Sequence, residues 1–359
     1  MRHRSREIRF WRKAKNNKMD GKNVCEQLQQ ALHLFFWDEQ EQVYRYRTLV
    51  GQGGGEGLPF SYWWQAHVID VLLDGYLRNR REEYLIQIQK ELAGVYVKNG
   101  NTLLNNWYDD MEWMALALLR LYDVTQSEEY KRQTELLWMD IKTGWNQYQG
   151  GGIAWKKDQV DYKNTPANAP AAILAYRLYE RFQRPEDLAW AEKVFLWNYD
   201  NLVDKQTGFV WDGKNRTGDE TIDYDWEYTY CQGVMVGAAL ERYKATGNGE
   251  NLELALKIAR EAERRFCESD GVLRYEGKDD CGLFRGIMIR YFAELAEFTS
   301  EAAGIRAMIL HNRDILVDKG LDGRWLAGKS WCQPPEVRVD LAQHLSGIML
   351  CEAAARLEK

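Results

Sequence analysis

The chain of 359 residues lacks the sequence features typical of disordered, membrane-spanning, zinc-binding and secreted proteins. It holds six prolines, too few for a disordered chain, and no apolar run of the roughly 18 residues that a membrane span requires. Its six cysteines form no C-x-x-C pair, and its five histidines add no zinc spacing, so we predict neither a metal nor a cofactor. No secretory-type apolar segment is seen near residue 1, and a cytoplasmic protein with reduced thiols is expected.

Acidic residues also outnumber basic ones outside the first residues, with 52 Asp and Glu against 40 Lys and Arg over 21–359. The net charge is −6, which argues against a broad attraction to nucleic acid or to an anionic membrane. Residues 1–20 are the exception, with eight Lys and Arg against two acids. We predict a basic, disordered tail over 1–20 and a single domain over 21–359, which we expect to be monomeric.

Aromatic residues, by contrast, are abundant. The 15 Trp, 20 Tyr and 11 Phe either fill a large core or line a groove for ligands with flat apolar faces. Composition alone leaves both open.

A period of 3.6 residues dominates the hydrophobic pattern and predicts an all-α protein. The expected helices lie near 22–36, 61–79, 82–98, 107–122, 128–146, 166–182, 186–200, 226–246, 250–266, 283–298, 301–317 and 338–357. Strand signals are few, short and confined to connections, such as 208–211 and 272–275.

The links between these helices alternate in length. Six long links, the first containing the glycine-rich stretch 51–57, alternate with five short ones. Because a short link makes two helices antiparallel, the pattern predicts six helical hairpins closed into an (α/α)6 barrel, with the long links on one rim. An open α-solenoid is the alternative, but it predicts a repeat consensus that the sequence lacks.

Two adjacent acids, Asp109 and Asp110, open one predicted inner helix, between Trp107 and Trp113. Acids near a helix N-terminus often only complement the helix dipole, for up to about 1 kcal/mol. Here the pair faces the rim of long links, on a helix where an uncompensated buried charge is costly, which favours a functional role.

Glycosidic bond cleavage is the chemistry that uses two carboxylates beside aromatic rings. One carboxyl protonates the leaving oxygen, while the other attacks the anomeric carbon or activates water. Neighbouring residues of a helix can reach the separation of about 5–5.5 Å typical of retaining enzymes, so the spacing favours retention with a covalent intermediate.

The sequence resembles glycoside hydrolase family 76, the α-1,6-mannanases. The resemblance is carried by the run Tyr108–Ala117 (YDDMEWMALA), with supporting blocks at 151–155, 163–164, 228–233 and 284–291. It implies an (α/α)6 barrel and a retaining, metal-independent cleavage of α-1,6-linked mannose chains. In that mechanism Asp109 would be the nucleophile and Asp110 the general acid/base.

Further residues are candidates for substrate contact through ring stacking or hydrogen bonds to sugar hydroxyls. They are Trp64, Trp107, Trp155, Asn164, Asn168, Trp211, Tyr230, Gln232 and Arg285. For Trp64, packing in the core is an equal alternative, and the amides could merely cap helices.

Two other functions remain open at this point. The first is another sugar enzyme of the α/α-barrel type, such as an unsaturated glucuronyl hydrolase, which would need cations for a uronic acid. Sugar 2-epimerases, which rely on histidine bases, are disfavoured by the few scattered histidines. The second is a glycan-binding protein without catalysis.

Overall fold

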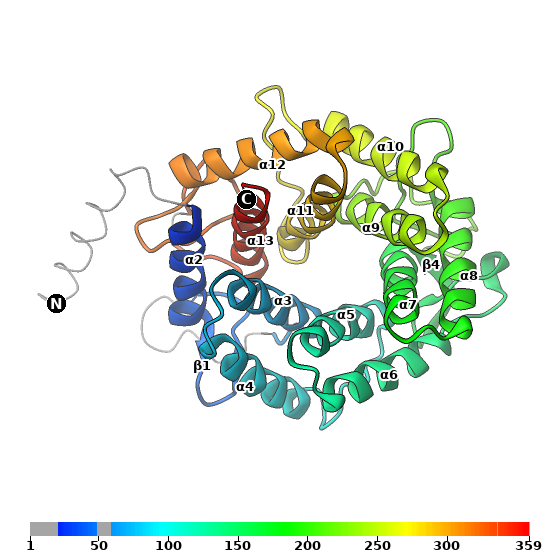
Figure 1. The fold of residues 1–359 in the computed structure, drawn as a ribbon, viewed down its shortest axis with the longest axis horizontal. Coiled ribbons are helices and arrows are strands. Elements are labelled where there is room, and N and C mark those ends of the chain that lie inside the picture. The colour runs from blue at the N-terminus through cyan, green and yellow to red at the C-terminus, as the bar shows by residue number, and fades with distance from the viewer. Residues whose placement is uncertain (1–20, 49–58, 336, 359) are drawn as a thin grey trace, which may run out of the picture. The chain divides into compact units, whose positions relative to one another are not determined.

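The computed structural model describes residues 21–48, 59–335 and 337–358. These residues fall into two compact units. Figure 1 shows their helices and strands. Unit 1 comprises residues up to 95, 267–289 and 306 onward, and unit 2 comprises 96–266 and 290–305. The predicted basic tail and the glycine-rich stretch 51–57 lie outside the described residues, and the single domain stays a prediction.

Every region predicted as helical forms an α-helix. The helices are α2 (Gly21–Phe36), α3 (Tyr62–Asn79), α4 (Glu83–Lys98), α5 (Tyr108–Thr125), α6 (Glu128–Lys142), α7 (Ala169–Phe182), α8 (Pro185–Leu202), α9 (Thr229–Thr246), α10 (Gly249–Phe266), α11 (Cys281–Phe298), α12 (Ala303–Ile315) and α13 (Leu341–Leu357). Long and short links alternate between them as expected. In the described part of the chain, no helix has the length and apolar character of a membrane span.

The short links share one construction. Arg80, Gln126, Gln183 and Gly247 end α3, α5, α7 and α9 in the left-handed conformation, with φ between 53° and 68°. In each case the backbone N–H of this residue donates to the carbonyl four residues earlier, which closes the helix and turns the chain back. Four tight αα-hairpins therefore follow from the same local geometry.

In unit 2 the helices form two layers. Helices α5, α7 and α9 pack against one another in chain order, and α6, α8 and α10 pack on α5, α7 and α9 respectively (Figure 1). The inner helix α9 is buried almost continuously from Cys231 to Glu241, whereas α10 buries one apolar stripe that includes Ala255, Ile258 and Ala262. Inner and outer helices thus differ in sequence as the hydrophobic pattern predicts.

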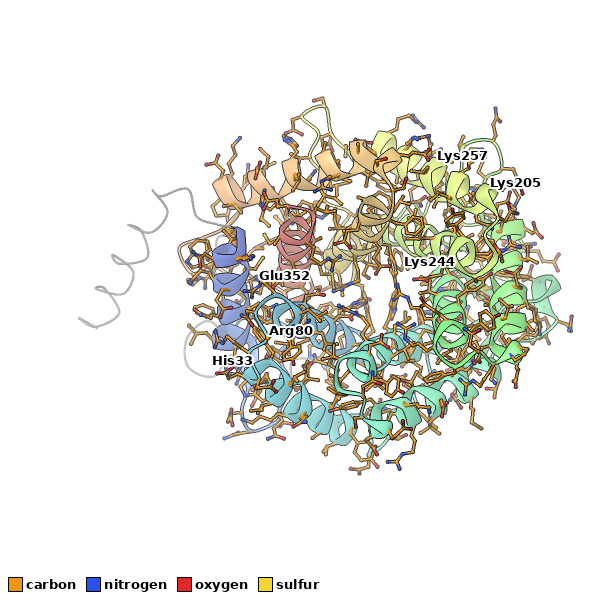
Figure 2. The ribbon with its side chains drawn as sticks, in the orientation of Figure 1. His33, Arg80, Lys205, Lys244, Lys257 and Glu352 are labelled. Atoms are coloured by element: carbon orange, nitrogen blue, oxygen red, sulfur yellow. The ribbon has the colours of Figure 1, made fainter. Side chains whose placement is uncertain are left out.

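In unit 1 the helices α2, α3 and α13 pack together. Glu352 of α13, labelled in Figure 2, accepts hydrogen bonds from Gln29 of α2 at 3.2 Å and from Arg78 of α3 at 3.1 Å. Glu352 is buried, and a buried carboxylate without a partner is unfavourable. The guanidinium of Arg78 forms an ion pair with it and so compensates its negative charge.

The strands are short and lie in the long links. β1 (Trp37–Asp38) pairs antiparallel with β2 (Val43–Tyr44), and β4 (Gln159–Asn164) lies between β3 (Ala154–Lys156) and β5 (Gly213–Lys214), antiparallel to both. The two strands predicted at 208–211 and 272–275 are corrected by the structure, because each segment makes only an isolated bridge there. Their bridge partners, Val203 and Cys267, stand at helix ends, which leaves too little extended chain for a ladder.

His344 in α13 is a buried ring whose two nitrogens both bond to backbone groups, and burial keeps the ring neutral. Its Nδ1 accepts from the N–H of Ala327 at 3.2 Å, so its Nε2 carries the proton and donates to the carbonyl of Leu28 at 3.1 Å. Burial lowers the pKa of His344 to about 4, from its ordinary 6.5.

We therefore expect the free energy of unfolding to fall as the pH falls from about 6.5 to about 4. In this window the unfolded chain binds a proton that the buried ring of His344 does not, which removes up to about 3 kcal/mol of stability. Urea unfolding at pH 7 and pH 4.5 should show a shallower pH dependence in His344→Gln. The exposed His311, in His311→Gln, is the control. Equal pH dependence in wild type and His344→Gln would contradict the assignment.

Candidate active site

The two predicted catalytic acids stand in the first turn of α5, in unit 2. Trp107 precedes the helix with an extended backbone (φ −91°, ψ 126°), and Asp109 and Asp110 follow within the first turn. Both acids are partly exposed, whereas Tyr108 and Met111 beside them are buried. The pair therefore sits where a helix embedded in the core reaches solvent.

Both oxygens of the Asp109 carboxylate accept hydrogen bonds. Its Oδ1 accepts from the backbone N–H of Asp110 at 2.9 Å, and its Oδ2 accepts from the indole Nε1 of Trp155 at 3.0 Å. Hydrogen bonds to a carboxylate favour its ionised form and fix its orientation.

The Asp110 carboxylate has a different partner. The side chain of Asn105 donates from Nδ2 to Oδ2 of Asp110 at 3.3 Å, while its own Oδ1 accepts from the N–H of Trp107 at 3.1 Å. One amide thus ties the start of α5 to the second acid. Sequence reasoning did not single out Asn105, because an Asn in a loop gives no pattern of its own.

Strand β3 carries Trp155 to Asp109. The backbone of Lys156 forms an isolated antiparallel β-bridge with the backbone of Trp107, and the N–H of Lys157 donates to the carbonyl of Asn106 at 2.9 Å. Strand β3 therefore runs beside the segment that enters α5. The indole of Trp155 then meets Tyr162 of β4 edge-on, with ring centroids 5.9 Å apart.

Behind Tyr162 lies a buried carboxylate, Asp212, that accepts from two tyrosines. Tyr162 donates to Oδ2 of Asp212 at 3.1 Å, and Tyr230 donates to Oδ1 at 2.7 Å. The thiol of Cys231 adds a contact to Oδ1 at 3.4 Å. Burial raises the pKa of Asp212, and these donors counteract the shift.

This arrangement gives Tyr230 a partner within the protein. Its hydroxyl donates to Asp212 and so joins α9 to the loop before β5, and its contact with a substrate stays a prediction. Gly213 after Asp212 has no room for a side chain, since a Cβ there would lie 2.3 Å from the hydroxyl of Tyr162. The sequence analysis missed Tyr162 and Asp212, although Asp212 follows Trp211 in a predicted long link.

The side chains of the three predicted amides all bond to neighbouring backbone groups of the protein. The side-chain oxygen of Asn164 accepts from the N–H of Ala167. The side chain of Asn168 accepts from the N–H of Ile153 and donates to its carbonyl. The side chain of Gln232 accepts from the N–H of Val210 and donates to its carbonyl. All three are buried. The structure therefore favours the capping alternative for Asn164 and gives Asn168 and Gln232 the role of fastening loops to helices.

Two predicted aromatic contacts keep exposed ring surface. Trp107 is 39% exposed beside the acid pair. Trp211 is half-buried and meets Phe209 and Tyr224 edge-on, at centroid distances of 4.6 Å and 5.0 Å. Their contact with a substrate stays a prediction.

Trp64 and Arg285 belong to unit 1, and both are buried there. Trp64 stacks on Tyr46 at 4.2 Å and donates to Oδ1 of Asp280 at 3.0 Å, the oxygen that Trp63 also approaches, at 3.2 Å. Packing, the alternative left open for Trp64, is what the structure shows.

Arg285 donates to the carbonyls of Leu273 and Lys329 at 3.1 Å and 2.8 Å, and its guanidinium lies 4.1 Å from the ring centre of Trp331. Burial lowers the pKa of Arg285 to about 10. This residue therefore ties two loops together, a role that differs from the predicted contact with a hydroxyl or carboxylate.

Metal ligands do not assemble in the part of the chain that the structure describes: no group of three or more His, Cys, Asp or Glu is placed to hold an ion. Neither of two surface pockets of unit 1, one of about 260 Å³ between α2, α3 and α4 and the other beside Glu352, includes the acid pair. The candidate active site is thus the carboxylate pair with its indole and amide partners.

An all-α protein of helical hairpins, with paired aspartates opening one helix, has the layout of a helical glycosyl hydrolase. Residues 22–335 match the family described as glycosyl hydrolase family 76, and the chain belongs to this family. The resemblance found in the sequence is thereby confirmed.

Solved structures extend the comparison. The chain is 40% identical to the α-1,6-mannanase from Salegentibacter sp. HEL1_6, covering 94% of this chain and all of that one, with a TM-score of 0.89. A protein from Listeria innocua is 39% identical, with 95% and 98% covered and a TM-score of 0.90. The fold class is therefore the (α/α)6 barrel that the alternating links predict.

Among curated relatives, the mannan endo-1,6-α-mannosidase of Candida glabrata is 24% identical over 206 residues, 52% of this chain. The match spans 46% of that enzyme's length, so somewhat less than half of the relative is represented. The Salegentibacter enzyme has also been solved as an inactive variant with two consecutive aspartates replaced by alanine, in complex with α-1,6-mannotetrose.

The Asp212 cluster predicts a large stability loss in Asp212→Ala. The substitution leaves the buried hydroxyl of Tyr162 and that of Tyr230 without their acceptor, at a cost of about 2–4 kcal/mol. Tyr162→Phe and Tyr230→Phe, which each remove one bond with its donor, should cost about 1 kcal/mol. Denaturant unfolding measures all three, and a loss in Asp212→Ala no larger than in Tyr162→Phe would refute the shared-acceptor arrangement.

Proposed function

We propose that the protein hydrolyses α-1,6-mannosidic linkages in mannan or manno-oligosaccharides by a retaining mechanism with two carboxylates. The observation that carries the proposal is the unequal environment of two adjacent aspartates at the start of α5. Asp109 accepts from an indole and a backbone N–H, whereas Asp110 accepts from an amide. The α-1,6-mannanase that is 40% identical over nearly the whole chain supports the substrate class.

The two environments suit two roles. A nucleophilic carboxylate must be ionised and held in a fixed orientation. The two hydrogen bonds that Asp109 accepts favour its ionised form and fix its orientation. A general acid must carry a proton before the reaction, and repulsion from an ionised neighbour favours a proton on Asp110. The inactive relative that lacks two consecutive aspartates agrees with this pairing.

The reaction then proceeds in two displacements. Asp110 gives its proton to the glycosidic oxygen while Asp109 attacks the anomeric carbon, so the C–O bond to the leaving sugar breaks and a glycosyl ester forms. Asp110, now ionised, takes a proton from water as the water attacks the same carbon. The ester bond breaks, Asp109 leaves as a carboxylate, and the configuration after two inversions is that of the substrate.

A uronic acid substrate, the alternative kept from the sequence, fits the site less well. It would need a cation free to bind its carboxylate. Near the acid pair, Lys156 is paired with Asp158 at 3.3 Å, and the buried Lys163 donates to the carbonyl of Gly152 at 2.8 Å. Both cations are engaged, which favours a neutral sugar such as mannose.

The cytoplasmic location and the monomeric state stay predictions alongside this proposal. Fractionation of the source cells and light scattering of the purified protein test them independently of the activity.

Replacing either aspartate should abolish turnover without unfolding the protein. Hydrolysis of α-1,6-mannotetraose should fall by about 10²–10⁴-fold in Asp110→Asn, the contribution typical of general acid/base catalysis, and at least as far in Asp109→Asn. Trp107→Phe, which changes an exposed ring beside the pair, serves as a folded comparison. Wild-type turnover in both aspartate variants would end the proposal, and binding of the tetraose by wild type without any hydrolysis would favour a glycan-binding protein.

The retaining mechanism predicts the configuration of the first product. Proton NMR of a fresh digest should show the α-anomer of the released reducing end before mutarotation, because two inversions restore the starting configuration. Asp110→Asn should recover activity on an aryl α-mannoside with an acidic phenol, since such a leaving group departs without a proton. Initial release of the β-anomer would show inversion instead.

A further inference from the structure

A third acid, Glu112, lies in the same helix as the catalytic pair. It follows Asp109 by three residues, which puts both side chains on one face of α5 about one turn apart. Glu112 has no exposed surface, and neither of its carboxyl oxygens has a hydrogen-bond partner. The backbone N–H of Ala171 on α7 faces this carboxyl and counteracts part of the shift that burial gives its pKa.

The surroundings of Glu112 disfavour a negative charge on it. The first turn of α7, residues 169–173, carries no titratable side chain. Lys156 and Lys157 of the adjoining β3 segment pair with Asp158 and Asp140. In the described part of the chain Glu112 forms no ion pair, and the charge of Asp109 acts on it. Burial, reinforced by Asp109, raises the pKa of Glu112 well above its ordinary value.

Two acids this close on one helix face share a constraint. When they interact strongly, one carries the proton and the other the charge, and the proton belongs on the more buried of the two. Glu112 is fully buried, while Asp109 reaches solvent and has two donors. The charge is therefore directed to the acid proposed as the nucleophile.

We propose that Glu112 is a positioning residue that keeps a proton, so that the negative charge of the Asp109–Glu112 pair stays on Asp109. The proposal rests on the proposed function and deepens it, because it explains how an acid in the core keeps the nucleophile ionised. An apolar side chain would fill this space without a buried unpaired polar group, so the retained carboxyl is expected to serve the neighbouring site.

The chain supplies a matched control in Glu91 of α4, in unit 1. Glu91 is also fully buried, its two carboxyl oxygens also lack hydrogen-bond partners, and burial also raises its pKa. The residues one turn before it are Gln87 and Ile88 rather than an acid. Substitutions at Glu91 therefore report the effect of a buried carboxyl without a catalytic neighbour.

The test compares Glu112→Met and Glu112→Gln with Glu91→Met and Glu91→Gln. Glu112→Met should lower kcat on α-1,6-mannotetraose about tenfold or more and move the acidic limb of the pH profile of kcat/KM to higher pH, because an apolar neighbour disfavours ionised Asp109. Glu112→Gln is neutral and polar like the protonated acid, so it should rescue kcat to within about twofold of wild type with the acidic limb in place. Both Glu91 variants should keep the wild-type kcat and profile.

Two kinetic outcomes would overturn the proposal. An acidic limb that moves to lower pH in Glu112→Gln would mean that Glu112 is ionised in the native enzyme. Equal kcat in Glu112→Met and Glu91→Met would mean that Glu112 only fills space.

Infrared spectroscopy tests the proton without reference to activity. At neutral pH the wild-type spectrum minus that of Glu112→Gln should contain the C=O band of a protonated carboxylic acid, and its absence would also refute the proposal. If wild type lacked activity on every α-1,6-manno-oligosaccharide, the proposed function would fail while the infrared result still decided the protonation of Glu112.

Discussion

The hydrogen bond from the indole of Trp155 to the carboxylate of Asp109 is the contact on which the arrangement of the candidate active site depends. It joins a strand in a long link to the first turn of a core helix, 46 residues earlier in the chain. A carboxylate at the end of a buried helix needs donors to stay ionised, and the indole supplies one while presenting its ring to the site. The other contacts described in unit 2 hold Trp155 and Asp109 in this arrangement.

Further residues of unit 2 hold Trp155 in place through a chain of contacts. Tyr162 braces Trp155 from one side, and Asp212 holds Tyr162 and Tyr230 from two different elements. Amides that first suggest sugar recognition, such as Asn168 and Gln232, instead fasten the backbone of the long links to the inner helices. The long links bring Trp155 and Asn105 to the acid pair, and buried polar side chains bond the backbone of the links to the inner helices.

Much of this was predictable because it is local or periodic. The twelve helices follow from the 3.6-residue pattern, the hairpins from the short links, and the acid pair from its place at the start of a buried helix. The short strands escaped prediction, because β3 and β5 pair with β4 through contacts that leave no alternation in so few residues. Arg285 and Trp64 were candidates for substrate contact because nothing in their local sequence reveals that carbonyls and rings enclose them.

The amino-acid sequence by itself determined the helices, their order, the alternation of the links and the place of two adjacent aspartates at the start of a helix. Only the tertiary structure decided which of the candidate polar side chains bond to other parts of the protein, because their partners lie far away in the chain. Asp212 and Glu112 illustrate the distinction. Both are ordinary acids in the sequence, yet Asp212 is buried among three side-chain donors, while Glu112 is buried with no side-chain donor on either oxygen. Burial and neighbouring charge set the protonation of such groups, and both arise only once the chain is packed.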